Sequence, residues 1–319
     1  MTAHSKNILK INIFLLILVL AGILMYHVLT GGNLNMLFDI FNLERKKPLC
    51  KRHYSTLYSK ARQKMTYFNF YLPLRKEPTE RFPVLYLLHG AMDSYKSWER
   101  EADEELKRLS ALYRLVIITP DGENYGWYLD STIQKTNRIK SYITKELIPH
   151  INTKLLANKV NGRQSIAGIS MGGHGALTLA IKDLIEGNNT FQSASSISGI
   201  LDITLHRESW QISSLLGEYE DDPLLWEAHS AYYLTKKYPE LVAKLPIYFT
   251  VGEDDEAAVD DNNNYLTILK ELAIPYSHQV VFEGDHDWTF WLTQLPDHIK
   301  WHAAQLIPKS RPEQKEKKH

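Results

Sequence analysis

The sequence predicts an α/β fold with a mostly parallel central sheet and helices on both of its faces. Short apolar runs alternate along the chain with longer segments of helical periodicity. The apolar runs are continuous, which is typical of strands that are covered on both faces. In addition, the glycine-rich turn 168–172 follows one of these runs and leads into a helical segment, a strand-to-helix connection that belongs to such sheets.

Seven apolar segments are expected to form the sheet. In chain order they are residues 66–72, 84–88, 115–119, 165–169, 194–197, 247–251 and 278–282. Pro73 and Pro120 end the first and third of them, because proline cannot donate to a strand ladder. Helices are expected after the glycine-rich turn and at residues 99–112, 136–155, around 222–238, 262–273 and 289–306.

Composition narrows the classes of function. The 319 residues contain 37 Lys and Arg and 37 Asp and Glu, so the formal net charge is zero and no basic excess indicates a nucleic-acid partner. The chain is long enough for one sizeable core. Its single cysteine, Cys50, excludes an internal disulfide framework and a cysteine-based zinc site.

Residues 1–29 form a hydrophobic N-terminus. Lys6 and Lys10 precede an apolar run at 11–29, and its 19 residues can span a bilayer as a helix. We interpret it as a membrane anchor. A cleaved signal sequence is the alternative, since residues 30–32 are small, although they contain no A-x-A site.

The remaining boundaries follow from composition. Residues 30–53 are predicted to be a linker, 54–308 a globular domain and 309–319 a disordered polar tail. Basic residues lie on both sides of the apolar run, which leaves the membrane orientation open. A domain behind such an anchor is most simply exported to the periplasmic or extracellular side, or secreted if the N-terminus is cleaved.

The turn Gly168-Ile169-Ser170-Met171-Gly172 has the G-x-S-x-G pattern of a nucleophile elbow, which exposes a serine hydroxyl between a strand and a helix. The helix N-terminus beyond it offers free N–H groups to an anion. Three fixed residues also occur by chance, so the context decides. A serine nucleophile needs a base, and the base needs an orienting acid.

Acids and a histidine follow two later strands. Glu253, Asp254 and Asp255 come directly after 247–251, and Asp285-His286-Asp287 follows 278–282. Both groups lie at carboxyl ends of strands, where active sites form in such sheets, and the order serine, acid, histidine is that of the elbow fold. We therefore expect His286 to be the base for Ser170, with the acid among the three candidates.

Two simpler interpretations of His286 exist. It could be a surface-loop histidine bonded to a neighbouring aspartate, which the strand-end placement and the elbow disfavour. It could also bind a metal with Asp285 and Asp287, but no second histidine stands at helical ligand spacing.

Acyl transfer also requires donors for the tetrahedral oxyanion. The N–H of Met171, next to the nucleophile, is one candidate. The other should come from the loop after an early strand. His89-Gly90 ends the strand at 84–88, and the N–H of Ala91 is the second candidate.

Several motifs in a fixed order resemble one family. They are Tyr86–Gly90 with Trp98, Pro120–Gly122 with Trp127-Tyr128, Gly168–Gly173, Ser196–Gly199 with Asp202, Gly252–Asp255 with Asn262, and Gly284–Trp288. This set, over roughly residues 55–308, resembles the esterase D group of the α/β-hydrolases. The group includes S-formylglutathione hydrolases, feruloyl esterases, short-chain acyl esterases and mycolyltransferases.

The resemblance implies an α/β-hydrolase fold that uses no cofactor. It implies Ser170 as nucleophile, His286 as base and Asp255 as acid, with Ala91 and Met171 at the oxyanion hole. If the family layout holds, His89, Trp127, Tyr128 and Trp288 would contact the substrate, and Trp98 would lie near them. Aromatic rings suit an acyl chain, an aryl acid or a sugar face equally well.

We therefore expect a serine esterase that hydrolyses carboxylic esters of short acyl or aryl acids through an acyl-enzyme. The alternative is an acyltransferase that moves the acyl group to a sugar or lipid hydroxyl. An S-formylglutathione thioesterase is less favoured, because the hydrophobic N-terminus differs from the cytosolic members. An inactive binding module and a non-enzymatic membrane protein would leave the intact motifs unexplained. The expected partners are a small-molecule ester and the membrane; the oligomeric state stays open.

Overall fold

A computed structural model describes residues 49–281 and 283–306, which contain an eight-stranded mixed sheet in the order β1-β2-β4-β3-β5-β6-β7-β8. The strands are β1 (Cys50–Ser59), β2 (Lys64–Pro73), β3 (Phe82–Leu88), β4 (Val116–Pro120), β5 (Val160–Ile169), β6 (Phe191–Ile197), β7 (Ile247–Gly252) and β8 (Ser277–Val281).

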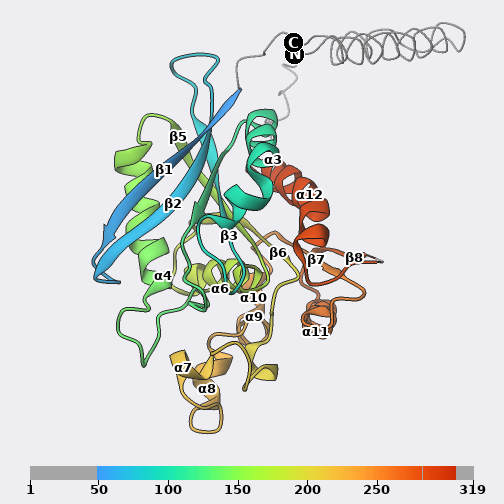
Figure 1. Cartoon of the computed structure of the whole chain (residues 1–319). Helices are drawn as coiled ribbons and strands as arrows, with labels where there is room; N and C mark the ends of the chain where they lie inside the picture. Colours follow the sequence, from blue (N-terminus) through green and yellow to red (C-terminus); the bar gives the residue numbers. More distant parts are fainter. Residues whose placement is uncertain (1–48, 282, 307–319) are drawn as a thin grey trace, which may run out of the picture. The chain divides into compact units, whose positions relative to one another are not determined.

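The six strands from β4 to β8 run parallel, and the β1–β2 hairpin adds to β4 in the antiparallel sense (Figure 1). All seven predicted strands are present. Strand order, direction and helical cover together make this an α/β-hydrolase sheet, so the predicted fold class is confirmed for the described residues.

Strand β1 was not predicted, and it begins at Cys50, within the segment 30–53 that the sequence predicts as a linker. Its sequence, CKRHYSTLYS, contains no apolar run. The strand lies at the edge of the sheet, and most of its side chains are exposed or half-buried. Polar and charged residues are typical of such an edge because they discourage pairing with another chain.

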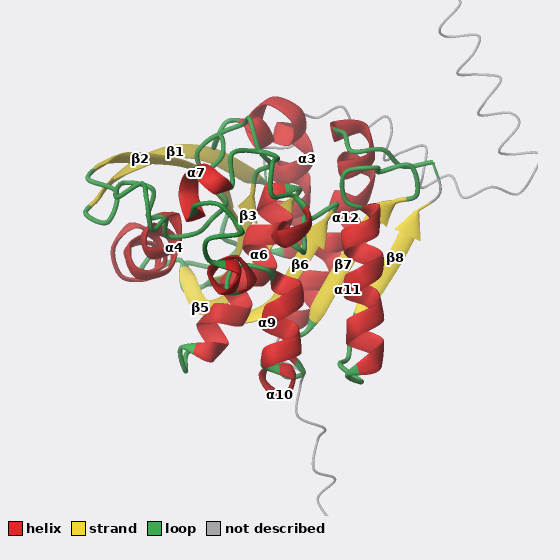
Figure 2. Ribbon diagram, turned by 90° about the horizontal axis from the view of Figure 1, so that it is seen from below, coloured by secondary structure: helices red, strands yellow, loops and turns green. Residues whose placement is uncertain are grey.

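Helices cover both faces of the sheet. The longer ones are α3 (Ser97–Tyr113), α6 (Met171–Ile185), α11 (Val259–Glu271) and α12 (Trp288–Leu306), and the shorter ones include α7 (Ser213–Leu216), α8 (Pro223–Glu227), α9 (Ala231–Lys237) and α10 (Pro239–Val242). Successive side chains of a strand point to opposite faces. In β3, Tyr86 packs on the α6, α9 and α11 side, whereas Leu85 and Leu87 pack on the α3 and α12 side. Figures 1 and 2 show α3 and α12 side by side.

The helix predicted at 136–155 differs from expectation. It begins at Ile139 and consists of α4 (Ile139–Ser141), a π-helical segment at Tyr142–Leu147, α5 (Ile148–His150) and a second π-helical segment at Ile151–Leu155. Pro149 lies between the two wide segments and has no N–H to donate. Proline inside a helix interrupts the regular hydrogen-bond ladder, and the wider turns accommodate it.

The predicted anchor at 1–29, most of the linker and the tail at 309–319 lie outside the described residues. Within the part of the chain that is described, no helix combines the length and apolar character needed to cross a membrane.

Candidate active site

Ser170 stands at the turn between β5 and α6, as the elbow pattern predicts. Its backbone has φ 52° and ψ −120°, a conformation that residues with a side chain rarely adopt. The flanking positions require glycine, because a side chain at either of them would clash with the neighbouring backbone. A Cβ on Gly168 would lie 2.3 Å from the backbone of Gly172, and one on Gly172 would lie 2.6 Å from the carbonyl oxygens of Leu88 and His89.

The structure brings Ser170, His286 and Asp255 into one hydrogen-bonded line. The Nε2 of His286 lies 2.9 Å from the Oγ of Ser170. On its other side, the Nδ1 of His286 lies 2.9 and 3.0 Å from the two carboxylate oxygens of Asp255. These residues are 31 and 116 positions apart from the histidine along the chain, and only the sheet brings them together.

The three acids after β7 differ in their surroundings. Asp255 is fully buried, whereas the neighbouring Glu253 and Asp254 are exposed. The Oδ1 of Asp255 also accepts a hydrogen bond from the N–H of Ala258 at 3.0 Å, which fixes the carboxylate. Asp255 is therefore the acid of this cluster that contacts His286.

The loops that carry Asp255 and His286 touch through their backbones. A Cβ on Gly252 would lie 2.0 Å from the carbonyl oxygen of Gly284, so the two chains approach as closely as glycine allows. The N–H of Asp254 donates to that same carbonyl at 3.0 Å. The acid and the histidine are thus held at a separation set by main-chain contact.

The predicted oxyanion donors lie on both sides of the nucleophile. Met171 is the first residue of α6, and Ala91 follows Gly90, whose added Cβ would lie 3.4 Å from the Cβ of Ser170. Among the residues that the structure describes, neither amide hydrogen has an acceptor, so both are free to bind an anion beside the serine.

A cavity of about 470 Å³ opens above Ser170. This volume lies within the range of roughly 300–1,000 Å³ that is typical of small-molecule sites. Four tryptophans line it, together with smaller apolar side chains and two aspartates: Trp127, Trp210, Trp288, Trp291, Ala91, Met92, Ile169, Ile200, Ala257, Asp93 and Asp287. The wall is therefore largely aromatic.

Comparison with known proteins shows the family of the chain. The family model described as "Putative esterase" matches residues 59–302. The chain belongs to this esterase family. Its members are serine hydrolases, and the chain is one as well.

Individual relatives match over most of their length. The bovine (Bos taurus) S-formylglutathione hydrolase is 31% identical over 262 residues, which cover 75% of this chain and 88% of the relative. The acetyl esterase of Caldicellulosiruptor saccharolyticus is 27% identical, with 76% and 95% covered. Among solved structures, an S-formylglutathione hydrolase from Agrobacterium tumefaciens has a TM-score of 0.71 at 24% identity, with 82% and 98% covered.

Two of the four residues predicted to contact substrate line the esterase's cavity, and two do not. Trp127 and Trp288 belong to its wall. His89 and Tyr128 are fully buried beneath it. The Nε2 of His89 accepts from the N–H of Gly122 at 2.8 Å, and the hydroxyl of Tyr128 donates to the carbonyl of His89 at 3.0 Å. Through these hydrogen bonds both side chains stabilise the loop that leads to Ala91. This structural role explains why they belong to the motifs although they do not reach the cavity.

Sequence reasoning missed Trp210 and Trp291. Trp291 lies on α12, one turn beyond the histidine loop, and its ring packs against that of His286 with centroids 5.1 Å apart. Trp210 lies in an irregular loop, where its carbonyl accepts from the Nε1 of Trp127 at 3.1 Å. Its ring packs 4.7 Å from that of His206, which bonds the buried Asp261 at 3.0 Å. No periodic pattern marks this loop in the sequence.

A second group of serine–histidine contacts lies inside the esterase, under α12. The Oγ of Ser195 lies 2.7 Å from the Nε2 of His302 and 2.9 Å from the Nδ1 of His298. All three residues are almost completely buried. The hydroxyl of Ser193 lies 2.8 Å from the Nδ1 of His302, and that of Thr250 lies 3.0 Å from the Nε2 of His298. The group is closed to a substrate, and no carboxylate within residues 49–281 and 283–306 contacts it, so it is a buried polar network that joins α12 to the sheet.

The buried network should make the fold sensitive to acid. Burial lowers the pKa of His302 to about 3, well below its ordinary value. The folded state therefore binds fewer protons than the unfolded state, so stability is complete above pH ~6.5 and declines below it, by about 1.4 kcal/mol per pH unit for this residue. In urea unfolding, the free energy of unfolding of the wild type should fall by about 2 kcal/mol more between pH 7 and pH 5 than that of His302→Gln. Equal slopes would contradict the assignment.

Proposed function

We propose that this esterase hydrolyses carboxylic esters of short acyl or aryl acids through an acyl-enzyme on Ser170. The observation that carries the proposal is the unbroken contact from Asp255 through His286 to Ser170, with 2.9 Å between Nε2 and Oγ. It is the arrangement that acyl transfer by a serine requires: a nucleophile bonded to a base, and a base oriented by an acid.

The first half-reaction forms the acyl-enzyme. The Nε2 of His286 takes the hydroxyl proton while the Oγ of Ser170 attacks the ester carbonyl carbon. The carboxylate of Asp255 holds the ring in the required tautomer and stabilises the imidazolium. The amide hydrogens of Ala91 and Met171 bind the oxyanion of the tetrahedral intermediate. Its collapse expels the alcohol, which takes the proton back from His286.

The second half-reaction releases the acid. Water enters where the alcohol left, gives a proton to His286 and attacks the acyl carbonyl. The second tetrahedral intermediate uses the same two donors. When it collapses, the proton returns to the Oγ of Ser170 and the free carboxylic acid leaves.

The cavity wall favours an uncharged acyl group. Four indole rings offer a large apolar surface to a short chain or an aryl ring. Asp287 lies in the same wall and its carboxylate would disfavour an anionic acyl group, whereas the carboxylate of Asp93 is paired with Arg100 at 2.9 Å. The relatives named above make S-formylglutathione and acetyl esters the first natural candidates to test alongside synthetic esters.

The proposal is tested by labelling and by product analysis. A fluorophosphonate should label the wild type, and peptide mass spectrometry should place the label on Ser170. p-Nitrophenyl esters of increasing acyl length then give the acyl preference, with S-formylglutathione run in parallel. Release of free acid in the presence of an added sugar or lipid alcohol supports hydrolysis, whereas transfer to the alcohol would identify an acyltransferase. A protein that is neither labelled nor active on any ester would contradict the proposal.

We further propose that residues 11–29 anchor the esterase in a membrane, with the catalytic domain on the exported side. The support is the 19-residue apolar run behind Lys6 and Lys10. The full-length chain should sediment with membranes, resist a carbonate wash and keep its N-terminus in Edman sequencing. A soluble product that begins near Asn33 would instead show a cleaved signal sequence.

A further inference from the structure

A second cavity, of about 550 Å³, lies away from the catalytic residues. Its lining includes four lysines and two glutamates, a formal excess of two positive charges: Lys140, Lys182, Lys236, Lys237, Glu186 and Glu227. It shares no residue with the cavity above Ser170. Lys182 stands twelve residues beyond Ser170 along α6, which corresponds to about 18 Å at the rise of an α-helix.

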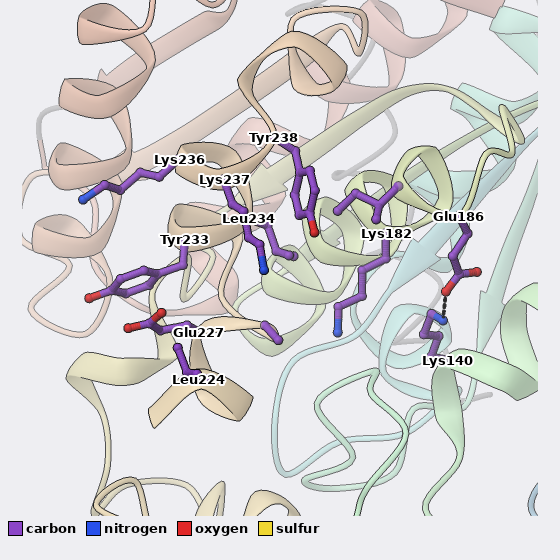
Figure 3. A pocket seen from close by; sticks show the side chains of 12 residues that line it. Lys140, Lys182, Glu186, Leu224, Glu227, Tyr233, Leu234, Lys236, Lys237 and Tyr238 are labelled. Atoms are coloured by element: carbon purple, nitrogen blue, oxygen red, sulfur yellow. Dashed lines mark hydrogen bonds and ion pairs between the residues drawn. The ribbon is translucent and has the colours of Figure 1, made fainter. Parts of the chain in front are cut away.

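The lysines of this cavity are not all neutralised. Lys140 forms an ion pair with Glu186, drawn as a dashed line in Figure 3. Among the residues that the structure describes, Lys182 and Lys237 have no carboxylate within ion-pair distance, and the Lys182 amine has no hydrogen-bond acceptor. Figure 3 shows the side chains of Lys182, Lys237 and Tyr238 extending into the same open space. The Lys237 amine also lies over the ring of Tyr238, 5.6 Å from its centroid, so two amines and a hydroxyl belong to the lining of one cavity.

The rest of the lining is apolar. Ile185, Leu224, Ala228 and Leu234 belong to the same cavity, as do the rings of Tyr233 and Tyr238. An inorganic anion would leave this apolar surface exposed to water. A molecule with an apolar body would bury it, and that burial would make the free energy of binding more favourable. The lining therefore fits a ligand that is anionic at one end and apolar at the other.

We propose that this cavity binds a small amphiphile with an oxyanion head, a carboxylate or a phosphate monoester, whose head contacts Lys182 and Lys237 and whose apolar body lies against the leucine and tyrosine side chains. A bound oxyanion would give the Lys182 amine a hydrogen-bond acceptor, which no side chain among the described residues supplies. Such charge-assisted hydrogen bonds are among the stronger ones in proteins.

The pKa of Lys182 bears on the charge of this cavity, because an amine with a lowered pKa is only partly protonated at neutral pH, and an oxyanion bound beside it would favour the protonated form. Burial, reinforced by the charge of Lys140, lowers the pKa of Lys182 to about 7. Lysines in the last turns of α6 and α9 also offset the partial negative charge of the helix ends, a role that needs no ligand. A lysine can offset the charge of a helix end while its amine stays in water. The helix-end role therefore does not explain why the amine of Lys182 is half-buried and close to Lys140.

The test uses the wild-type protein first. Lys182 is acetylated with an N-hydroxysuccinimide ester, and its rate of modification is measured by peptide mass spectrometry with octanoate, octyl phosphate or uncharged octanamide present. At about ten times its Kd, a charged amphiphile should slow the modification of Lys182 roughly tenfold. The exposed Lys270 on α11 is the control and should react at an unchanged rate. Whichever head protects at the lower concentration is the preferred group.

Variants give the second measurement. Lys182→Gln should weaken binding of the better charged probe about tenfold or more in titration calorimetry, whereas Lys270→Gln should leave it unchanged. Unchanged thermal unfolding of Lys182→Gln shows that the fold is intact. Lack of protection by either charged probe, equal protection by octanamide, or equal affinity of wild type and Lys182→Gln would each overturn the proposal. The protection assay needs no variant and decides the question even if Lys182→Gln fails to fold.

Discussion

Ser170→Ala is expected to lower kcat/KM for p-nitrophenyl acetate by about 10⁴–10⁶-fold, the loss seen when a hydrolase triad loses its nucleophile. The fold should persist, because the alanine removes one oxygen at the surface of the cavity and leaves the elbow glycines in place. Thermal unfolding checks the fold, and steady-state kinetics on the purified variant measure the loss.

Ser195→Ala is the matched control for this experiment. Ser195 also contacts a histidine, but it lies in the buried network under α12. Its removal leaves the polar atoms of His298 and His302 short of a partner, which costs on the order of 1–3 kcal/mol of stability. Activity per folded molecule should stay near that of the wild type. A Ser170→Ala enzyme that keeps a tenth of its rate would remove Ser170 from the role of nucleophile, and a folded Ser195→Ala enzyme that loses its activity would contradict the purely structural role of Ser195.

Asp255→Asn should lower kcat by roughly 10⁴-fold with little change in KM, because it removes the charge that orients His286 while it preserves the shape of the side chain. Asp254→Asn, one residue away and exposed, should cost less than about tenfold. Both variants are compared with the wild type at saturating ester. Reversed results would make Asp254 the acid, and two silent substitutions would place the acid elsewhere in the chain.

The sequence could predict most of the sheet and the three residues of the hydrogen-bonded line because each lies beside a strong local signal. Continuous apolar runs mark the buried strands, and the elbow glycines mark Ser170. His286 and the acids directly follow such runs, so the parallel sheet alone brings them to one edge. Within the acidic cluster, spacing from the residues left three options, and burial of Asp255 distinguishes it from its exposed neighbours.

What could not be predicted depends on contacts between distant segments. Strand β1 is polar because it lies at the sheet edge, so no apolar run announces it. Trp210 reaches the cavity from an irregular loop through contacts with Trp127 and His206. His89 and Tyr128 were assigned to the substrate because they adjoin the motifs, yet their side chains turn inward. Tertiary packing decides where a side chain points, whereas a sequence motif gives only the position of the residue along the chain.

The contact between Gly252 and Gly284 has a consequence for engineering this enzyme. The main chains of the two loops meet there, and the ring of Phe290 also packs on Gly284, 2.6 Å from where an added Cβ would lie. Loop libraries aimed at new ester specificities can vary Trp127 and Trp210, whereas Trp291, whose ring packs 5.1 Å from that of His286, should be kept. The same libraries should retain glycine at both positions, since even a methyl group would act as a wedge between the two loops and enlarge the gap that the imidazole must bridge.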